Sequence, residues 1–424
     1  MISRRVILLP LTGIRYVTTT SSNSRNSLTN HWGVLLPVFA ALVLAALWAM
    51  PRANRNPNSL VVYCAHDAVY ADEILKDFEK QTGIHVDVRY DTEATKSLGL
   101  INLIQQERRQ PRCDVFWNNE MLGTLELKSQ GLLEPYTGSA WKRIPEKYRD
   151  DEGYWVGFAA RLRVVIVNTR EFTARIPVIA GTESSDAGSS IPTSILDGGA
   201  IQDVVTLETS KVAAAKPLFG TTLTHYTVLW DLWGPDRLKD WHHELRSRGM
   251  REVSGNGPVK DVVASGTCQI GLTDTDDVFV ALDEKLPVDM FPVRMPPAID
   301  PEEPVSAVNA IPVEAPLLRL SYVPVTATGA QGGTICIPNT AAIIRKTQHI
   351  DAAQKLIDYL ASEEVELKLA RSKSRQIPLG PVNDEELPAE VRRLKEWAAD
   401  GIDLRPLLNA RRECLQWLRS EYVR

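Results

Sequence analysis

The sequence has little of what marks a disulfide-rich or a nucleic-acid-binding protein. Its 424 residues contain only 5 cysteines and no Cys-x-x-Cys pair. Most of these cysteines lie in or beside apolar runs, which is typical of cysteines that pack as small hydrophobic residues and argues against a disulfide scaffold. The formal charge of -5 provides no basic surface, so nucleic acid is not an expected partner.

Signatures of common enzymes are also missing. The chain has no Gly-x-Ser-x-Gly elbow, no Walker-type phosphate loop, no His-Glu-x-x-His and no Gly-x-Gly-x-x-Gly after its first predicted strand. An exported hydrolase that uses Glu120 and Asp276 is the enzymatic alternative, but no complete set of nucleophile, base and orienting residue can be assembled for it. The sequence therefore favours a protein that binds its ligand without transforming it.

One segment departs from an ordinary globular composition. Residues 32–50 form an uncharged apolar run, preceded by a basic segment over 1–31 and followed by a polar linker over 51–58. Such a run is either the apolar region of a signal peptide or an uncleaved membrane anchor. We expect the rest of the chain to be periplasmic or extracytoplasmic, anchored in the cytoplasmic membrane if the run is retained.

After the linker, strands that end in polar clusters alternate with helices. The predicted strands over 60–64, 84–90 and 115–117 each end in small polar residues just before a helix. In open parallel sheets, ligands bind in the crevice outside the carboxyl ends of the strands, where helix N-termini present free backbone N–H groups. The polar clusters therefore predict a ligand site.

The same pattern recurs further along the chain and predicts two lobes. Lobe 1 is expected over 59–157 with a return around 285–345, and lobe 2 over 158–284, completed by 346–424. A Pro-rich insertion is predicted over 295–333, and one amphipathic helix over 350–369. His242 and His243 fall on a charged helix, which predicts a solvated face for both.

Two ligand chemistries are open from the residues alone. Carboxylates and an imidazole at predicted strand ends suit a hard or borderline metal ion; the candidate ligands are His66, Glu120, Asp276 and Asp277. The alternative for acidic residues such as Glu93 and Asp277 is that they cap helices and bind nothing.

The second chemistry is the binding of a small oxyanion such as a phosphonate. Hydroxyls, amides and helix N-termini bind carboxylates and phosphates. Arg161, together with Arg163, lies on one face of a predicted strand, for which a solvated edge is the alternative interpretation. The candidate ligand-binding residues are Thr92, Glu93, Thr95, Asn118, Arg161, Thr221, Thr222, Asn256 and Thr273.

The order of several motifs resembles a known family. His66-Asp67, the segments 78–84 and 90–96, then 114–117 and 131–136 are similar to those of the class 1 extracellular solute-binding proteins, in particular the ferric-iron-binding branch of ABC importers. The resemblance continues to about residue 380. It implies an α/β, two-lobed periplasmic-binding-protein type fold with a central mixed sheet in each lobe and a ligand cleft between them.

The resemblance also implies a metal site and a partner. A histidine after the first strand and a glutamate after the third are iron ligands in that family, and they map onto His66 and Glu120. The family's tyrosine pair would fall near 275–277, where this chain has no tyrosine; Asp276 and Asp277 are oxygen donors that could replace it. We expect a monomeric importer component for ferric iron or another metal ion, without a resident cofactor, that closes by a hinge and is recognised by an ABC permease in the cytoplasmic membrane.

Overall fold

The computed structural model describes residues 58–91, 98–171, 209–295 and 333–422. The apolar run over 32–50, most of the Pro-rich insertion, and the candidate residues Thr92, Glu93 and Thr95 lie outside these ranges. None of the helices in the described part is long and apolar enough to cross a membrane.

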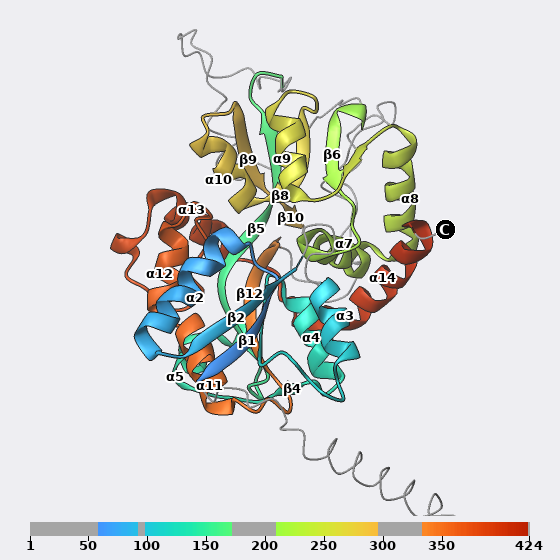
Figure 1. Ribbon diagram of the computed structural model, residues 1–424. Coiled ribbons are helices and arrows are strands. Elements are labelled where there is room, and N and C mark those ends of the chain that lie inside the picture. The colour runs from blue at the N-terminus through green and yellow to red at the C-terminus, as the bar shows by residue number, and fades with distance from the viewer. Residues whose placement is uncertain (1–57, 92–97, 172–208, 296–332, 423–424) are drawn as a thin grey trace, which may run out of the picture. The chain divides into compact units, whose positions relative to one another are not determined.

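The described chain alternates strands and helices (Figure 1). The strands are β1 Ser59–Cys64, β2 His85–Tyr90, β3 Val115–Asn118, β4 Leu133–Glu134, β5 Val156–Asn168, β6 Val212–Ala215, β7 Arg251–Val253, β8 Ile270–Asp274, β9 Val288–Pro292, β10 Arg294–Met295, β11 Gly333–Thr334 and β12 Cys336–Ile344. The helices are α2 Ala68–Thr82, α3 Leu98–Gln106, α4 Met121–Ser129, α5 Ser139–Arg143, α7 Gly220–Trp233, α8 Pro235–Ser247, α9 Asn256–Ala264, α10 Thr275–Asp283, α11 Ile350–Leu360, α12 Glu363–Arg371, α13 Ala389–Ala398 and α14 Leu408–Tyr422.

All of these strands except β10 and β11, which pair with each other, form a mixed sheet in two halves that share β5. The order is β2-β1-β3-β12-β5-β8-β6-β7, with β4 added beside β12 and β9 beside β5. Strands β1, β2 and β3 are parallel to one another, as are β6, β7 and β8, whereas β12 runs antiparallel to β3 and β5 antiparallel to β8. The two halves are the two lobes of the expected fold class, but α11, which was expected in lobe 2 as part of 346–424, packs with β1 and α2 of the first lobe.

Strand β5 passes from one lobe to the other. Its first half pairs with β12 up to Leu162, and its second half pairs with β8 from Arg163 onward. The register with β12 shifts at Pro338 and Asn339, and nearby Ala159 has a φ of 41°, an uncommon conformation for a residue with a side chain. Arg161 and Arg163 thus lie where the lobes meet.

Helices pack on both faces of the sheet and bury its apolar side chains. In the first lobe, Leu60 and Val62 of β1 pack with α2 and α11, while Tyr63, on the other face, packs with α3 and α4. In the second lobe, α9 and α10 cover one face, and α7, α8 and α14 pack with the other. Strands that are buried on both faces are apolar along their whole length. This explains why the uninterrupted apolar runs of the sequence form the inner strands of the sheet.

Two expectations are corrected by the structure. The single helix expected over 350–369 is two helices, α11 and α12, because Ser362 ends the first and its hydroxyl accepts a hydrogen bond from the N–H of Val365 at the start of the second. His242 is fully buried rather than solvated, because α14 packs against α7, which in turn packs on α8. His243, in contrast, has a half-exposed side chain.

Candidate functional site

A small cavity lies where the strands of both lobes end and several helices begin. Its volume is about 40 Å³, room for an ion with a few waters, since one water needs roughly 10–15 Å³. The chain segments around it follow β1, β3, β6, β7 and β8. Its lining residues are Asp67, Asn119, Arg161, Ala215, Phe219, Gly220, Thr221, Thr222, Gly255, Asn256, Gly257, Asp274, Asp276 and Asp277.

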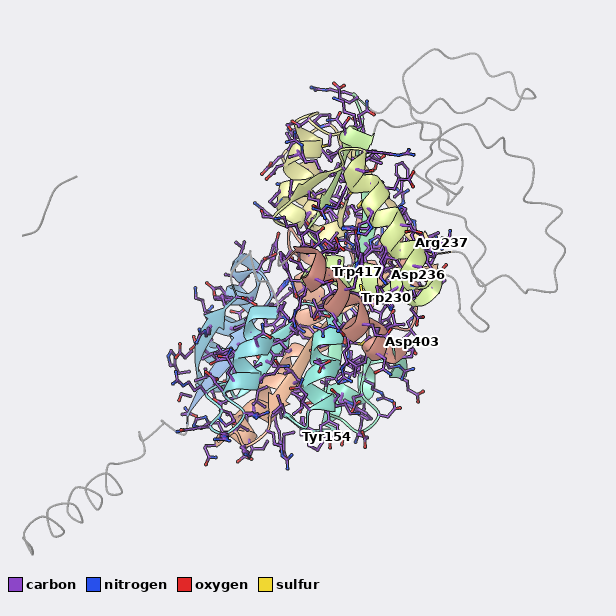
Figure 2. All side chains as sticks on the ribbon, turned by 90° about the vertical axis from the view of Figure 1, so that its right-hand side faces the viewer. Tyr154, Trp230, Asp236, Arg237, Asp403 and Trp417 are labelled. Atoms are coloured by element: carbon purple, nitrogen blue, oxygen red, sulfur yellow. The ribbon has the colours of Figure 1, made fainter. Side chains whose placement is uncertain are left out.

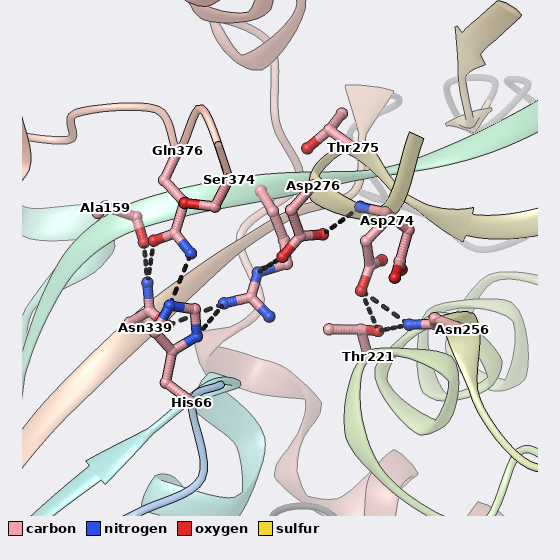
Figure 3. A network of polar contacts seen from close by, with 12 residues as sticks. His66, Ala159, Thr221, Asn256, Asp274, Thr275, Asp276, Asn339, Ser374 and Gln376 are labelled. Carbon is pink, nitrogen blue, oxygen red and sulfur yellow. Dashed lines mark hydrogen bonds and ion pairs between the residues drawn. The ribbon is translucent and has the colours of Figure 1, made fainter. Parts of the chain in front are cut away.

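Arg161 is a buried cation that contacts His66 and Asp276, two labelled residues of the polar network in Figure 3. Its Nε lies 3.6 Å from Oδ2 of Asp276, and its Nη2 donates to Oδ1 of Asn339 at 2.9 Å. Burial alone would lower the pKa of this guanidinium, but Asp276 and the neighbouring carboxylates raise the pKa overall. The interpretation of Arg161 as a solvated edge residue is therefore wrong, because β12 covers that edge.

Arg163 forms a second buried pair on the second-lobe side. Its Nη1 donates to Oδ1 of Asp274 at 2.7 Å, and the other carboxylate oxygen accepts from the Thr221 hydroxyl at 2.5 Å and from Nδ2 of Asn256 at 2.9 Å. The Thr222 hydroxyl also contacts Asn256, at 3.1 Å. These contacts tie the N-termini of α7 and α9 to the end of β8.

Three carboxylates gather at the N-terminus of α10. Asp274, Asp276 and Asp277 each offer an oxygen, and these oxygens all lie within 4.8 Å of one another. The Thr273 hydroxyl donates to Oδ2 of Asp277 at 2.8 Å. A helix N-terminus favours negative charge, and carboxylates are the kind of oxygen ligand that hard cations prefer.

His66 lies next to Arg161, at the other side of the network. Its Nδ1 is 3.3 Å from Nη2 of Arg161, and its Nε2 is 3.1 Å from Nε2 of Gln376. The ring is buried and stacked between Trp117 and Tyr70, with centroid distances of 5.4 and 5.9 Å. Coordination of a metal by His66 would require one of these two donors to move.

Glu120 and Asn118 lie at the start of α4. Oε1 of Glu120 accepts from the N–H of Gly123 at 2.8 Å and from Nδ2 of Asn118 at 3.4 Å. Asn118 also donates to the Thr124 hydroxyl at 3.2 Å. Burial raises the pKa of Glu120. In the described structure, neither residue is among those that line the cavity.

The structure brings together most of the described candidates and adds others. Six of them line the cavity: Thr221, Thr222, Asn256, Arg161, Asp276 and Asp277. A seventh, Thr273, donates a hydrogen bond to Asp277. Asp67, which directly follows His66, also lines it, and Tyr70 lies close enough that Asp276 adds to the rise of its pKa to about 12. The spacing of Tyr70 one helical turn after His66 could have suggested it. No sequence pattern pointed to Gln376, which approaches His66 from a distant segment.

Curated relatives match a limited part of the chain. The major ferric iron-binding protein of Neisseria meningitidis serogroup A is 28% identical over 140 residues, which is 32% of this chain and 39% of that protein. The Fe(3+)-binding periplasmic protein of Serratia marcescens is 26% identical over 127 residues, 30% of this chain and 36% of that protein. The chain thus aligns with well under half the length of each relative.

Solved structures match over most of the chain and share its fold. Iron-bound HitA from Pseudomonas aeruginosa has a TM-score of 0.58 at 18% identity, covering 84% of this chain and 99% of that one. Apo ferric ion-binding protein A from Pasteurella haemolytica has a TM-score of 0.60 at 18% identity, covering 86% and 97%. The periplasmic binding protein AfuA from Actinobacillus pleuropneumoniae, with fructose-6-phosphate bound, has a TM-score of 0.58 at 17% identity, covering 86% and 98%.

A family model covers the described sheet almost completely. It matches residues 60–371, a range that runs from β1 to the end of α12 and so includes both lobes and the cavity between them. The two-lobed fold and the cavity between the lobes both lie within the matched range. The chain belongs to the bacterial extracellular solute-binding protein family.

Proposed function

We propose that the chain is the extracytoplasmic substrate-binding component of an ABC importer and that its cargo is a hard metal cation, with ferric iron the first candidate. The observation that carries this proposal is the group of three carboxylates, Asp274, Asp276 and Asp277, at the edge of the cavity. Oxygen ligands of this kind suit hard cations. The names of the curated relatives support iron in particular.

The balance of charge around the cavity also favours a cation. The carboxylates of Asp67, Asp274, Asp276 and Asp277 surround it, and two guanidiniums, Arg161 and Arg163, pair with Asp276 and Asp274. Carboxylates thus outnumber guanidiniums among these residues, which favours a cation. The proposed metal binds on the Asp277 side, because Arg161 already occupies the space between Asp276 and His66.

This ligand set differs from the one inferred by resemblance. His66 and Glu120 are left out of it, because each makes other contacts in the described structure, His66 with Arg161 and Gln376 and Glu120 with the first turn of α4. The exported hydrolase gains no support, since Glu120 is not among the residues lining the described cavity. Binding by closure of the two lobes about β5, and recognition of the closed form by a permease, belong to the same proposal.

A small oxyanion is the second candidate, and one observation favours it. Helices α7 and α9 begin at the cavity with no side-chain hydrogen bond at Phe219 or Gly255, their N-cap residues. Their first backbone N–H groups, together with Arg161, could bind a phosphate or phosphonate. The solved relative with bound fructose-6-phosphate has this fold. The carboxylates at the cavity oppose an anion.

Two substitutions separate the candidates because their effects have opposite signs. For a metal, Asp276→Asn should weaken binding by roughly 100-fold or more, since loss of an outer-shell group alone costs about 10–100-fold. Arg161→Met should strengthen metal binding, because it removes a cation beside a ligand. For an oxyanion, Arg161→Met should cost about 1.5–3 kcal/mol for a lost charge-assisted hydrogen bond, and Asp276→Asn should be neutral or favourable.

The measurement is isothermal titration of the variants with ferric citrate, divalent metals and a phosphonate panel. Asp261→Asn is the matched control, because Asp261 has a side chain 66% exposed on α9, away from the cavity lining. Its affinities should equal those of the wild type. Unchanged metal affinity in Asp276→Asn would overturn the metal proposal.

A further inference from the structure

A basic pocket lies at the edge of the first lobe, outside the ligand cavity. It has a volume of about 280 Å³, and apolar side chains form part of its lining beneath exposed cations. The lining residues are Ile104, Arg108, Arg109, Pro111, Gly131, Leu132, Ile344, Arg345 and Lys346. We call the four cations Arg108, Arg109, Arg345 and Lys346 the basic patch.

The basic patch lies at the end of the sheet opposite the ligand cavity. Arg108 and Arg109 precede β3, and Arg345 and Lys346 follow β12, whose last residue donates its N–H to the carbonyl of Asp114 at the start of β3. Because β1 and β3 run parallel and carry the cavity residues after their carboxyl ends, the patch lies at their amino ends.

The charge of the patch is not neutralised within the described chain. Arg108, Arg109 and Lys346 form no ion pair with any described residue, and Arg345 donates to the carbonyl of Gly131 at 3.3 Å. The nearest acidic neighbour in sequence, Glu107, instead accepts from the Tyr63 hydroxyl at 3.0 Å and lies 3.9 Å from Nε of Arg112. A concentrated positive charge therefore faces solvent above an apolar floor.

The chain enters the fold at this same edge. Strand β1 begins at Ser59, level with the residues before β3. Residues 51–58 are all that separate it from the apolar run over 32–50, and that linker contains two more arginines, Arg52 and Arg55. We propose that the basic patch binds the anionic phospholipid surface of a membrane.

The residue types fit this partner better than a soluble anion. Arginine and lysine lay their aliphatic stems along apolar surface while the charged ends remain in water. The charged ends of the basic patch can therefore contact lipid phosphates, while the apolar side chains of the pocket contact the acyl chains beneath them. Each basic residue near an anionic surface contributes about 1 kcal/mol, equivalent to a factor of about five in partitioning.

Vesicle flotation tests the proposal on residues 56–424. This part forms one compact unit, and its described hydrophobic clusters draw on residues 60–418 alone. It should float with phosphatidylcholine vesicles that contain phosphatidylglycerol and remain behind with phosphatidylcholine alone. The combined variant Arg108→Glu, Arg109→Glu and Lys346→Glu should lose roughly 100-fold in partitioning, from about fivefold per lost cation.

A matched variant controls for net charge. Lys285→Glu, Lys373→Glu and Arg419→Glu reverse three exposed cations elsewhere, and this protein should float as the wild type does. Equal flotation of both variants, or equal binding to neutral vesicles, would overturn the proposal. So would saturable binding of glycerol phosphate to the patch without vesicle binding, because that result assigns a soluble anion. Metal titration of the same proteins reports on the cavity separately, so the two proposals fail independently.

Discussion

The carboxylate of Glu120 is both the predicted metal ligand and the N-cap of α4. Its Oε1 accepts from the N–H of Gly123, and burial raises its pKa. We expect Glu120→Ala to lower the free energy of unfolding by about 1 kcal/mol, the usual cost of losing an N-cap. Glu120→Gln, which keeps an acceptor oxygen, should recover most of that loss.

The metal affinity of the two variants shows whether Glu120 acts only as the N-cap of α4 or also as a metal ligand. Because Glu120 does not line the described cavity, neither variant should change the affinity for ferric iron measured by titration. Urea denaturation of the same samples gives the stability change. A Gln variant of normal stability that no longer binds metal would identify Glu120 as a ligand and contradict this prediction.

Arg161 shows what residue patterns could not predict. A strand period of two placed Arg161 and Arg163 on one face, and the structure places both against carboxylates at the cavity. The pattern could not show whether that face was solvated. The answer depends on β12, which follows β5 by more than a hundred residues in the sequence and covers the edge of β5.

At the level of elements, local signals were reliable and distant pairings were not. Strand β1 and the polar residues after it were predicted from an apolar run followed by a helix start, because both signals are contained in a few residues. The break between α11 and α12 was missed, since apolar periodicity continues across Ser362. The joining of β5 with β12 and of α14 with α7 depends on contacts between distant segments that no local pattern encodes.

Packing of α14 on α7 buries His242 of α8, whose ring centroid lies 5.4 Å from that of Trp417. Trp417 of α14 lies next to Trp230 of α7, with ring centroids 5.7 Å apart (Figure 2). The Tyr422 hydroxyl donates to Glu252, so its oxygen can accept from Nε2 of His242, 3.4 Å away. Nδ1 of His242 is then the acceptor for the Tyr226 hydroxyl at 3.0 Å. This arrangement requires a neutral ring.

Burial lowers the pKa of His242 to about 4, with a further contribution from Arg246. The unfolded chain, with a histidine pKa of about 6.5, therefore binds more protons than the folded chain between these values. Stability should fall as the pH drops from about 6.5 towards 4 and should change little from this residue above 6.5. Melting curves at a series of pH values measure the effect.

His242→Gln is the comparison, because glutamine keeps hydrogen-bonding groups but does not titrate. The difference in melting temperature between wild type and variant should narrow or reverse as the pH falls through this window. Parallel pH profiles for wild type and His242→Gln would show that another group is responsible.

At the scale of the whole molecule, the proposed closure of the lobes depends on β5, the strand that they share. It belongs to both halves of the sheet, and residues from both lobes meet beside it: His66 after β1 in the first lobe and Asp276 in α10 of the second, each next to Arg161. A ligand that contacts both lobes should favour the closed form by the difference between its affinities for the two forms.

Metal binding should therefore compact and stabilise the protein together. We expect ferric iron to reduce the radius of gyration measured by small-angle scattering. At a free ligand concentration a hundredfold above Kd, binding should add about 2.7 kcal/mol to the free energy of unfolding. Asp276→Asn, measured with the same iron solution, should gain at most about 0.4 kcal/mol after a 100-fold loss of affinity and should compact less, because its cavity lacks one of the three carboxylates. Tight binding that raises the melting temperature while the radius stays constant would reject hinge closure and would mean that the lobes are already closed before the metal arrives.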